Sequence, residues 1–68
     1  MKKIGQIIKQ RRKNLLITQK ELAELAGIGI NTLTKIERGE ANPSFDLLQK
    51  VLDTLGLEVV VQIKKRNL

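Results

Sequence analysis

Side chains that can exchange hydrogen bonds with another molecule gather between residues 18 and 39 of this 68-residue chain. They are the hydroxyl, amide and cationic groups of Thr18, Gln19, Asn31, Thr32, Lys35 and Arg38. Such groups can read base-pair edges and hold phosphates. The chain has no histidine, cysteine or tyrosine, so the commonest general bases and nucleophiles are missing. We therefore expect that the protein is not an enzyme and binds no cofactor and no metal.

The charge of the chain favours a polyanionic partner. Thirteen Lys and Arg against seven Asp and Glu give a net charge of +6 and a pI near 10.1, and excess positive charge favours nucleic acid through counterion release. Membrane-surface proteins share this property, so its weight depends on the elements that hold the cations. No apolar run approaches the about 18 residues of a membrane span. We expect one small cytoplasmic, nucleoid-associated domain without membrane contact.

A helix is predicted to begin at Thr18. Thr18 and Glu21 have the T-x-x-E spacing of a capping box, in which each side chain satisfies a free amide at a helix start. The helix is expected to run to residue 26, with Leu22 and Leu25 facing inward. Gly27 then supplies the left-handed turn that glycine adopts most cheaply. The following segment completes the spacing of a helix-turn-helix.

That following segment, residues 29–38, is predicted to be a helix that buries Leu33 and Ile36 and enters the major groove of DNA. Asn31 can pair with adenine and Lys35 with guanine. Ile30 either contacts a thymine methyl or is an ordinary exposed apolar residue. We expect phosphate contacts from the backbone amides and side chains of Thr18 and Gln19 at the start of the first helix, and from Arg38 at the other end of the pair. The full set of expected DNA-binding residues is Thr18, Gln19, Gly29, Ile30, Asn31, Thr32, Lys35 and Arg38.

A flanking helix is expected over residues 2–14, with its apolar stripe on Ile4, Ile8 and Leu15 and its other cations turned largely away. The stripe also includes Arg12. A guanidinium drawn toward a core needs a carboxylate partner, and Glu37 is our candidate. The alternative is that Arg12 reaches solvent along its aliphatic stem.

A further helix is predicted after residues 42–44, with Ser44 as its N-cap and an apolar stripe through Leu48, Val51, Leu52 and Leu55. Gly56 followed by Leu57 reads as its C-terminal cap. These elements define one expected domain over residues 1–57.

Residues 58–64 are β-branched and partly alternating, which is typical of a strand. The sequence offers this strand no partner, so we expect it to pair antiparallel with a second copy and form a homodimer. The expected dimerisation residues are Val59, Val60, Val61 and Ile63. The alternative is that the segment folds back on its own domain. A frayed basic tail is expected at residues 65–68.

Six short motifs are distributed along the chain: Arg-Arg-Lys at 11–13, Thr-Gln at 18–19, Glu-Leu-Ala at 21–23, Leu-Ala-Gly-Ile at 25–28, Ile-Glu-Arg-Gly at 36–39 and Asn-Pro-Ser at 42–44. Through these motifs the chain resembles, from residue 4 to residue 57, the Xre and phage-repressor (Cro-type) helix-turn-helix family. The resemblance implies an all-α, phage-repressor-like domain of four to five short helices, here with one C-terminal β-strand pairing in a dimer. It also implies a palindromic double-stranded DNA operator and a buried Arg12–Glu37 ion pair.

Two positions depart from the family pattern. Glycine is frequent between the first two helices, where this chain has Leu16, so a left-handed cap is expected to be absent there or taken by Asn14. The family often has Ser-Arg where this chain has Gly29-Ile30, so base preferences do not transfer from its members.

The segment from Leu55 to Lys65 is similar to the end of HipB-like antitoxins. This implies a transcriptional repressor that autoregulates its operon and binds a HipA-like serine/threonine kinase toxin. The alternatives are a phage-type repressor, a restriction-modification controller without a toxin partner, and a protein-binding module.

Overall fold

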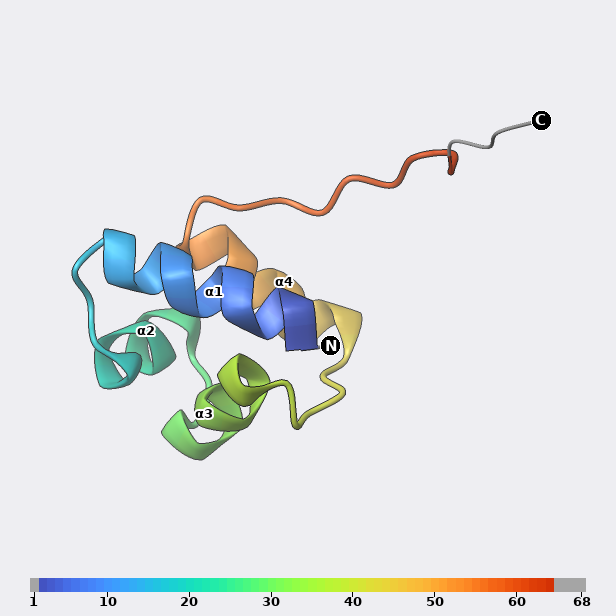
Figure 1. The fold of residues 1–68 in the computed structure, drawn as a ribbon. Helices are drawn as coiled ribbons and strands as arrows, with labels where there is room; N and C mark the ends of the chain where they lie inside the picture. Colours follow the sequence, from blue (N-terminus) through green and yellow to red (C-terminus); the bar gives the residue numbers. More distant parts are fainter. Residues whose placement is uncertain (1, 65–68) are drawn as a thin grey trace.

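The protein folds into four short helices joined by two tight turns and a longer loop before α4 (Figure 1). The computed structural model describes residues 2–64, so the tail expected at residues 65–68 lies outside the described residues. The helices are α1 (Lys2–Asn14), α2 (Gln19–Ala26), α3 (Ile30–Arg38) and α4 (Phe45–Thr54). The expected all-α helix-turn-helix fold is confirmed, with four helices in the described range. No helix within residues 2–64 has the length and apolar character to cross a membrane.

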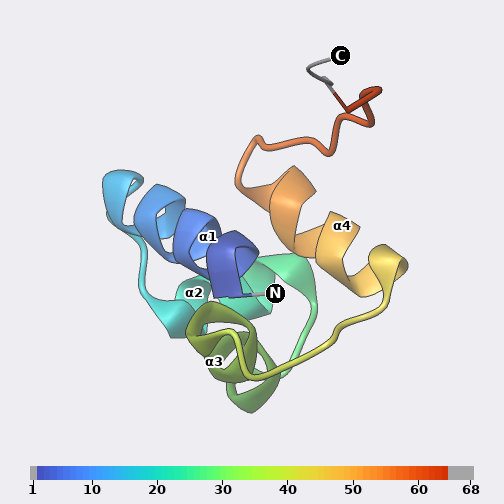
Figure 2. The same ribbon diagram turned by 45° about the vertical axis from the view of Figure 1, so that its right-hand side comes forward.

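One hydrophobic core joins the four helices. α1 packs on α3, and α2 packs on both α3 and α4 (Figure 2). The largest fully buried side chains are Ile8, Leu22, Leu33, Val51 and Leu55. Each contributes about 1.5–3 kcal/mol of transfer free energy relative to an exposed position. The core therefore fixes α2 and α3 from their inner faces and leaves their outer faces free.

The prediction that Leu25 faces inward is wrong, because Leu25 is 68% exposed. The buried residues of α2 are Leu22, Ala23 and Ala26. At about 100° per residue, Leu25 lies beside this group at the edge of the helix face. Spacing from Leu22 alone did not locate the centre of the buried face.

α1 approaches the end of α3 closely at Gly5. A Cβ atom built there would lie 2.2 Å from the carbonyl oxygen of Ile36 and 2.9 Å from that of Glu37. These distances are too short for any side chain, so only glycine lets α1 rest on the end of α3. Gly5 therefore sets the depth at which α3 sits against α1.

The turn between α1 and α2 is built on a left-handed Leu16. Its φ is 59°, its amide donates to the Lys13 carbonyl at 3.0 Å, and the Ile17 amide donates to the Arg12 carbonyl at 3.3 Å. The expectation that this cap is absent or taken by Asn14 is therefore wrong. The two hydrogen bonds satisfy free carbonyls at the end of α1, while a side chain with Cβ occupies a region that favours glycine.

The C-terminal end of α4 has the expected cap. Gly56 has φ 70°, and the Leu57 amide donates to the Leu52 carbonyl at 2.8 Å. Arg11, expected to point largely to solvent, instead donates from Nε to the Leu55 carbonyl at 2.9 Å. A cation at the negative end of a helix is favourable. Arg11 thus ties α1 to the point where the chain leaves α4.

Residues 58–64 run away from the helices in both views (Figures 1 and 2). Val61 is 93% exposed and Ile63 is 100% exposed, so the alternative in which the whole segment folds back on its own domain is wrong. No strand is assigned within residues 2–64 of this single chain. The expected strand requires a second copy, and its pairing stays a prediction.

Candidate nucleic-acid interface

The turn between α2 and α3 is a short glycine-centred connection. Gly27 has φ 70° and ψ 37°, and its amide donates to the Glu24 carbonyl at 3.2 Å. The next amide, that of Ile28, donates to the Ala23 carbonyl at 2.9 Å, and its side chain packs against the core. A Cβ at Gly27 would meet no atom within 4 Å, so glycine is favoured there by the left-handed backbone alone.

α3 presents a polar stripe to solvent. Asn31, Lys35 and Arg38 are exposed and follow the i, i+4, i+7 spacing of one helix face. Leu33, Ile36 and Glu37 are buried on the opposite side. The structure thus brings together one amide and two cations on a helix whose inner face is fixed.

The N-terminal end of α3 lies beside this stripe. Gly29 is the N-cap, with φ −71° and ψ 146°, and it supplies no side-chain cap. Ile30 is 45% exposed and Thr32 is exposed. The first-turn amides of the helix therefore lack a capping side chain, and its positive end is open to an approaching polyanion.

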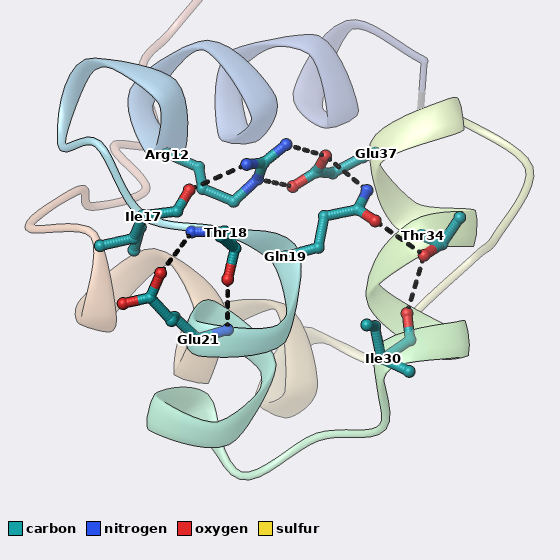
Figure 3. Close-up of polar contacts among 8 residues, drawn as sticks. All are labelled: Arg12, Ile17, Thr18, Gln19, Glu21, Ile30, Thr34 and Glu37. Carbon is teal, nitrogen blue, oxygen red and sulfur yellow. Dashed lines mark hydrogen bonds and ion pairs between the residues drawn. The ribbon is translucent and has the colours of Figure 1, made fainter.

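The N-terminal end of α2 has the predicted capping box (Figure 3). Thr18 Oγ1 accepts from the Glu21 amide at 3.0 Å, and Glu21 Oε1 accepts from the Thr18 amide at 3.0 Å. The Thr18 amide, which we expected to face a phosphate, is therefore occupied by the Glu21 carboxylate. The amides of Gln19 and Lys20 follow at the first two helical positions, where no intrahelical acceptor exists.

A buried ion pair joins α1 to α3. Arg12 Nε donates to Glu37 Oε2 at 2.7 Å and Arg12 Nη2 donates to Glu37 Oε1 at 3.1 Å. The side chains are only 10% and 2% exposed, so Arg12 does not follow the alternative of reaching solvent. Arg12 Nη1 also donates to the Ile17 carbonyl at 2.9 Å. The bidentate contact between Arg12 and Glu37 and the hydrogen bond to the Ile17 carbonyl compensate for the free-energy cost of burying the two charges.

Gln19 extends this pair to α2 (Figure 3). Its Nε2 donates to Glu37 Oε1 at 3.0 Å. An ionised carboxylate only accepts hydrogen bonds, so the NH₂ group of Gln19 and not its oxygen must face Glu37. Its Oε1 lies 3.2 Å from the Thr34 hydroxyl, which also lies 2.9 Å from the Ile30 carbonyl. The side chain that we expected at a phosphate thus spans the two helices of the motif. One N–H of Gln19 remains for an outside acceptor.

Sequence reasoning missed two residues of this interface. Thr34 is not among the expected DNA-binding residues, because its role opposite Gln19 depends on how α2 and α3 cross. Lys20 is exposed and adds a cation next to the free first-turn amides of α2. Its position two residues after the capping threonine could have identified it.

Comparison with known proteins agrees with this geometry. Residues 8–61 match the helix-turn-helix family. The chain belongs to this family. Because the match contains α2, the Gly27 turn and α3, it includes the whole of the candidate interface.

Individual relatives are regulators and a phage repressor. The chain is 46% identical over 65 residues to the HTH-type transcriptional regulator SinR of Bacillus subtilis, covering 94% of this chain and 59% of that protein. It is 38% identical over 65 residues to the immunity repressor protein of Bacillus phage phi105, covering 96% and 45%. An uncharacterized HTH-type transcriptional regulator of Methanothermobacter thermautotrophicus is 37% identical over 57 residues, covering 84% and 83%. The chain thus spans about half the length of SinR and the phage repressor.

Proposed function

We propose that this protein is a sequence-specific DNA-binding transcriptional repressor that reads a palindromic operator as a homodimer. The observation that carries the proposal is the stripe of Asn31, Lys35 and Arg38 on a helix whose opposite face is held by the core. Relatives named as transcriptional regulators and as a phage repressor support it. This assignment is to a binding protein and not to an enzyme.

In the proposed complex the N-terminal half of α3 lies in the major groove. Asn31 pairs with an adenine and Lys35 donates to a guanine, since each side chain matches the edge of that base. Ile30 and Thr32 contact thymine methyls or neighbouring edges, and Gly29 lets the backbone approach closely. These contacts supply the sequence preference.

Phosphate contacts set the position of α3 in the groove. The free amides of Gln19 and Lys20 lie at the positive end of α2, and the Thr18 hydroxyl retains its proton for donation while its oxygen caps the helix. Arg38 reaches a phosphate from the far end of α3. These contacts give affinity without sequence preference.

The Arg12–Glu37–Gln19 network supports this arrangement. Because it links α1 and α3 through buried hydrogen bonds and α2 through a part-buried one, the two helices of the motif approach DNA as one unit. Gln19 has two tasks in the proposal, since it positions α3 and presents an amide at the phosphate end of α2. Pre-organisation of this kind reduces the ordering cost of binding.

The experiment is a binding-site selection from random duplex DNA, followed by affinity measurements on the selected and a scrambled duplex over a range of salt concentrations. We expect a selected palindrome, a strong preference over the scrambled duplex, and an affinity that falls steeply with salt. Equal affinity for both duplexes at physiological salt would instead favour the protein-binding module.

The finer assignment, a HipB-like antitoxin that autoregulates its operon and binds a HipA-like serine/threonine kinase, is the second candidate. The observation that favours it is the exposed apolar segment 58–64, which resembles the end of those antitoxins. Co-purification with the product of an adjoining kinase-like gene would support this candidate. A neighbouring phage or methyltransferase gene would instead favour a phage-type repressor or a restriction-modification controller.

A further inference from the structure

The segment 58–64 has unused bonding capacity. It follows the cap at Leu57, and its backbone forms no hydrogen bond with other parts of residues 2–64. Val60, Val61 and Ile63 are 61%, 93% and 100% exposed. An apolar segment with free N–H and C=O groups is a template for pairing with another strand. Within residues 2–64 these backbone groups are left to solvent, and a second strand can pair with them.

We propose that residues 58–64 pair antiparallel with the same residues of a second copy, about a two-fold axis at Val61, so that Glu58 faces the partner's Lys64. This inference rests on the homodimer of the proposed function and specifies its interface. It names the partner, the register and the charged pair that selects the register.

Symmetry restricts the register. Residues directly opposite in an antiparallel pair point to the same face of the ribbon, and a two-fold axis keeps equivalent residues on one face. The axis must therefore pass through a residue and not between two. An axis at Val61 gives each of the seven residues an opposite residue from the partner's segment 58–64. An axis at Val60 or Gln62 leaves residues at one end of the segment without such a partner.

Charge complementarity favours the axis at Val61. In that register Glu58 faces the partner's Lys64 and Lys64 faces the partner's Glu58, which gives two opposite-charge pairs per dimer. An axis at Val60 would set Glu58 against Gln62 and lose both pairs.

The helices provide a place for the apolar face of the ribbon. Val59 lines two adjoining grooves of about 250 and 150 Å³ between α1, α4 and the start of the segment. The smaller groove also has Ile4, Ile7, Leu52 and Leu57 in its walls. In the proposed register the partner's Ile63 lies opposite Val59 and covers this groove. Pairing therefore buries apolar surface of the ribbon and of the helices together.

Charge exchange tests the register in the full-length chain. The single variants Glu58→Lys and Lys64→Glu each place like charges opposite one another, and we expect the dimer dissociation constant to rise about five- to thirtyfold at low salt. A mixture of the two variants restores both opposite-charge pairs only in the heterodimer. With one variant isotopically labelled, native mass spectrometry should show mostly heterodimers, and the double variant should regain the parental dissociation constant.

Cysteine cross-linking tests the axis independently, because the chain has no cysteine of its own. Val61→Cys places two thiols opposite each other, within the range in which a disulfide closes, and should form a covalent dimer under mild oxidation. Val60→Cys and Gln62→Cys are matched controls that should cross-link poorly alone and efficiently when mixed. Faster cross-linking of Val60→Cys or Gln62→Cys alone would overturn the register.

These readouts separate this inference from DNA binding. Statistical mixing of the charge variants, or a parent chain that stays monomeric at all concentrations, overturns the inference even where DNA selectivity persists. Loss of sequence selectivity with intact heterodimer preference overturns the proposed function and leaves the strand register standing.

Discussion

The guanidinium of Arg12 in α1 and the carboxylate of Glu37 in α3 meet through hydrogen bonds of 2.7 and 3.1 Å in a site from which water is nearly excluded. The pair holds the exposed helix α3 against the rest of the fold, with Gln19 as the link to α2. Glu37, the one carboxylate of α3, therefore has a structural role and is not needed as a DNA-contacting residue.

Replacing Glu37 by Ala should lower the free energy of unfolding by about 3–5 kcal/mol, because it leaves the Arg12 charge buried without a counter-charge. Urea denaturation followed by circular dichroism measures this loss. The paired replacement of Arg12 by Met and Glu37 by Leu removes both charges and should recover most of the stability. A Glu37→Ala variant as stable as the parent would show that the pair does not hold α3.

Replacing Gly5 by Ala should lower the free energy of unfolding by about 1–3 kcal/mol, since the added methyl group meets the backbone of α3 at 2.2 Å and the helices must move apart. Thermal denaturation measures the effect. Gln6→Ala, at the exposed next position of α1, is the control and should be neutral or slightly stabilising. Equal melting temperatures for the two variants would contradict the close approach.

Replacing Leu16 by Gly should raise the free energy of unfolding by about 1 kcal/mol, because the left-handed backbone at φ 59° disfavours a residue with Cβ. Leu16 is 89% exposed, so little packing is lost. Leu16→Ala is the matched control, which keeps Cβ and should leave stability nearly unchanged. Destabilisation by glycine relative to alanine would mean that the strain is absent.

The elements that depend on local sequence were predictable. The Thr18–Glu21 capping box, the Gly27 turn and the Gly56–Leu57 cap each arise from contacts within a few residues along the chain. The apolar stripe of α4 was also predictable, because spacing alone defines a buried helix face.

Three features that depend on other tertiary contacts were not predictable from the same patterns. Gly5 matters through a carbonyl on α3, Arg11 through a carbonyl at the end of α4, and Gln19 through Glu37. The partner in each case is at least 18 residues away along the chain. Leu16 is a different case. The hydrogen bonds that end α1 require a left-handed backbone at this position, although leucine disfavours that conformation.

In the proposed complex, Asn31 on α3 reads a base while Arg38 on the same face binds a phosphate. Removing a base contact should cost about 1–3 kcal/mol and relax preference at one position of each half-site, whereas removing a phosphate contact should weaken all sequences similarly. Both side chains are exposed, so neither change should disturb the core.

The most direct measurement is a binding-site selection from random duplex DNA with the parent, Asn31→Ala and Arg38→Ala chains in parallel. We expect Asn31→Ala to lose preference at one symmetric pair of positions, while Arg38→Ala keeps the parental motif with lower affinity and a shallower salt dependence. An Asn31→Ala motif identical to that of the parent at every position would show that Asn31 reads no base.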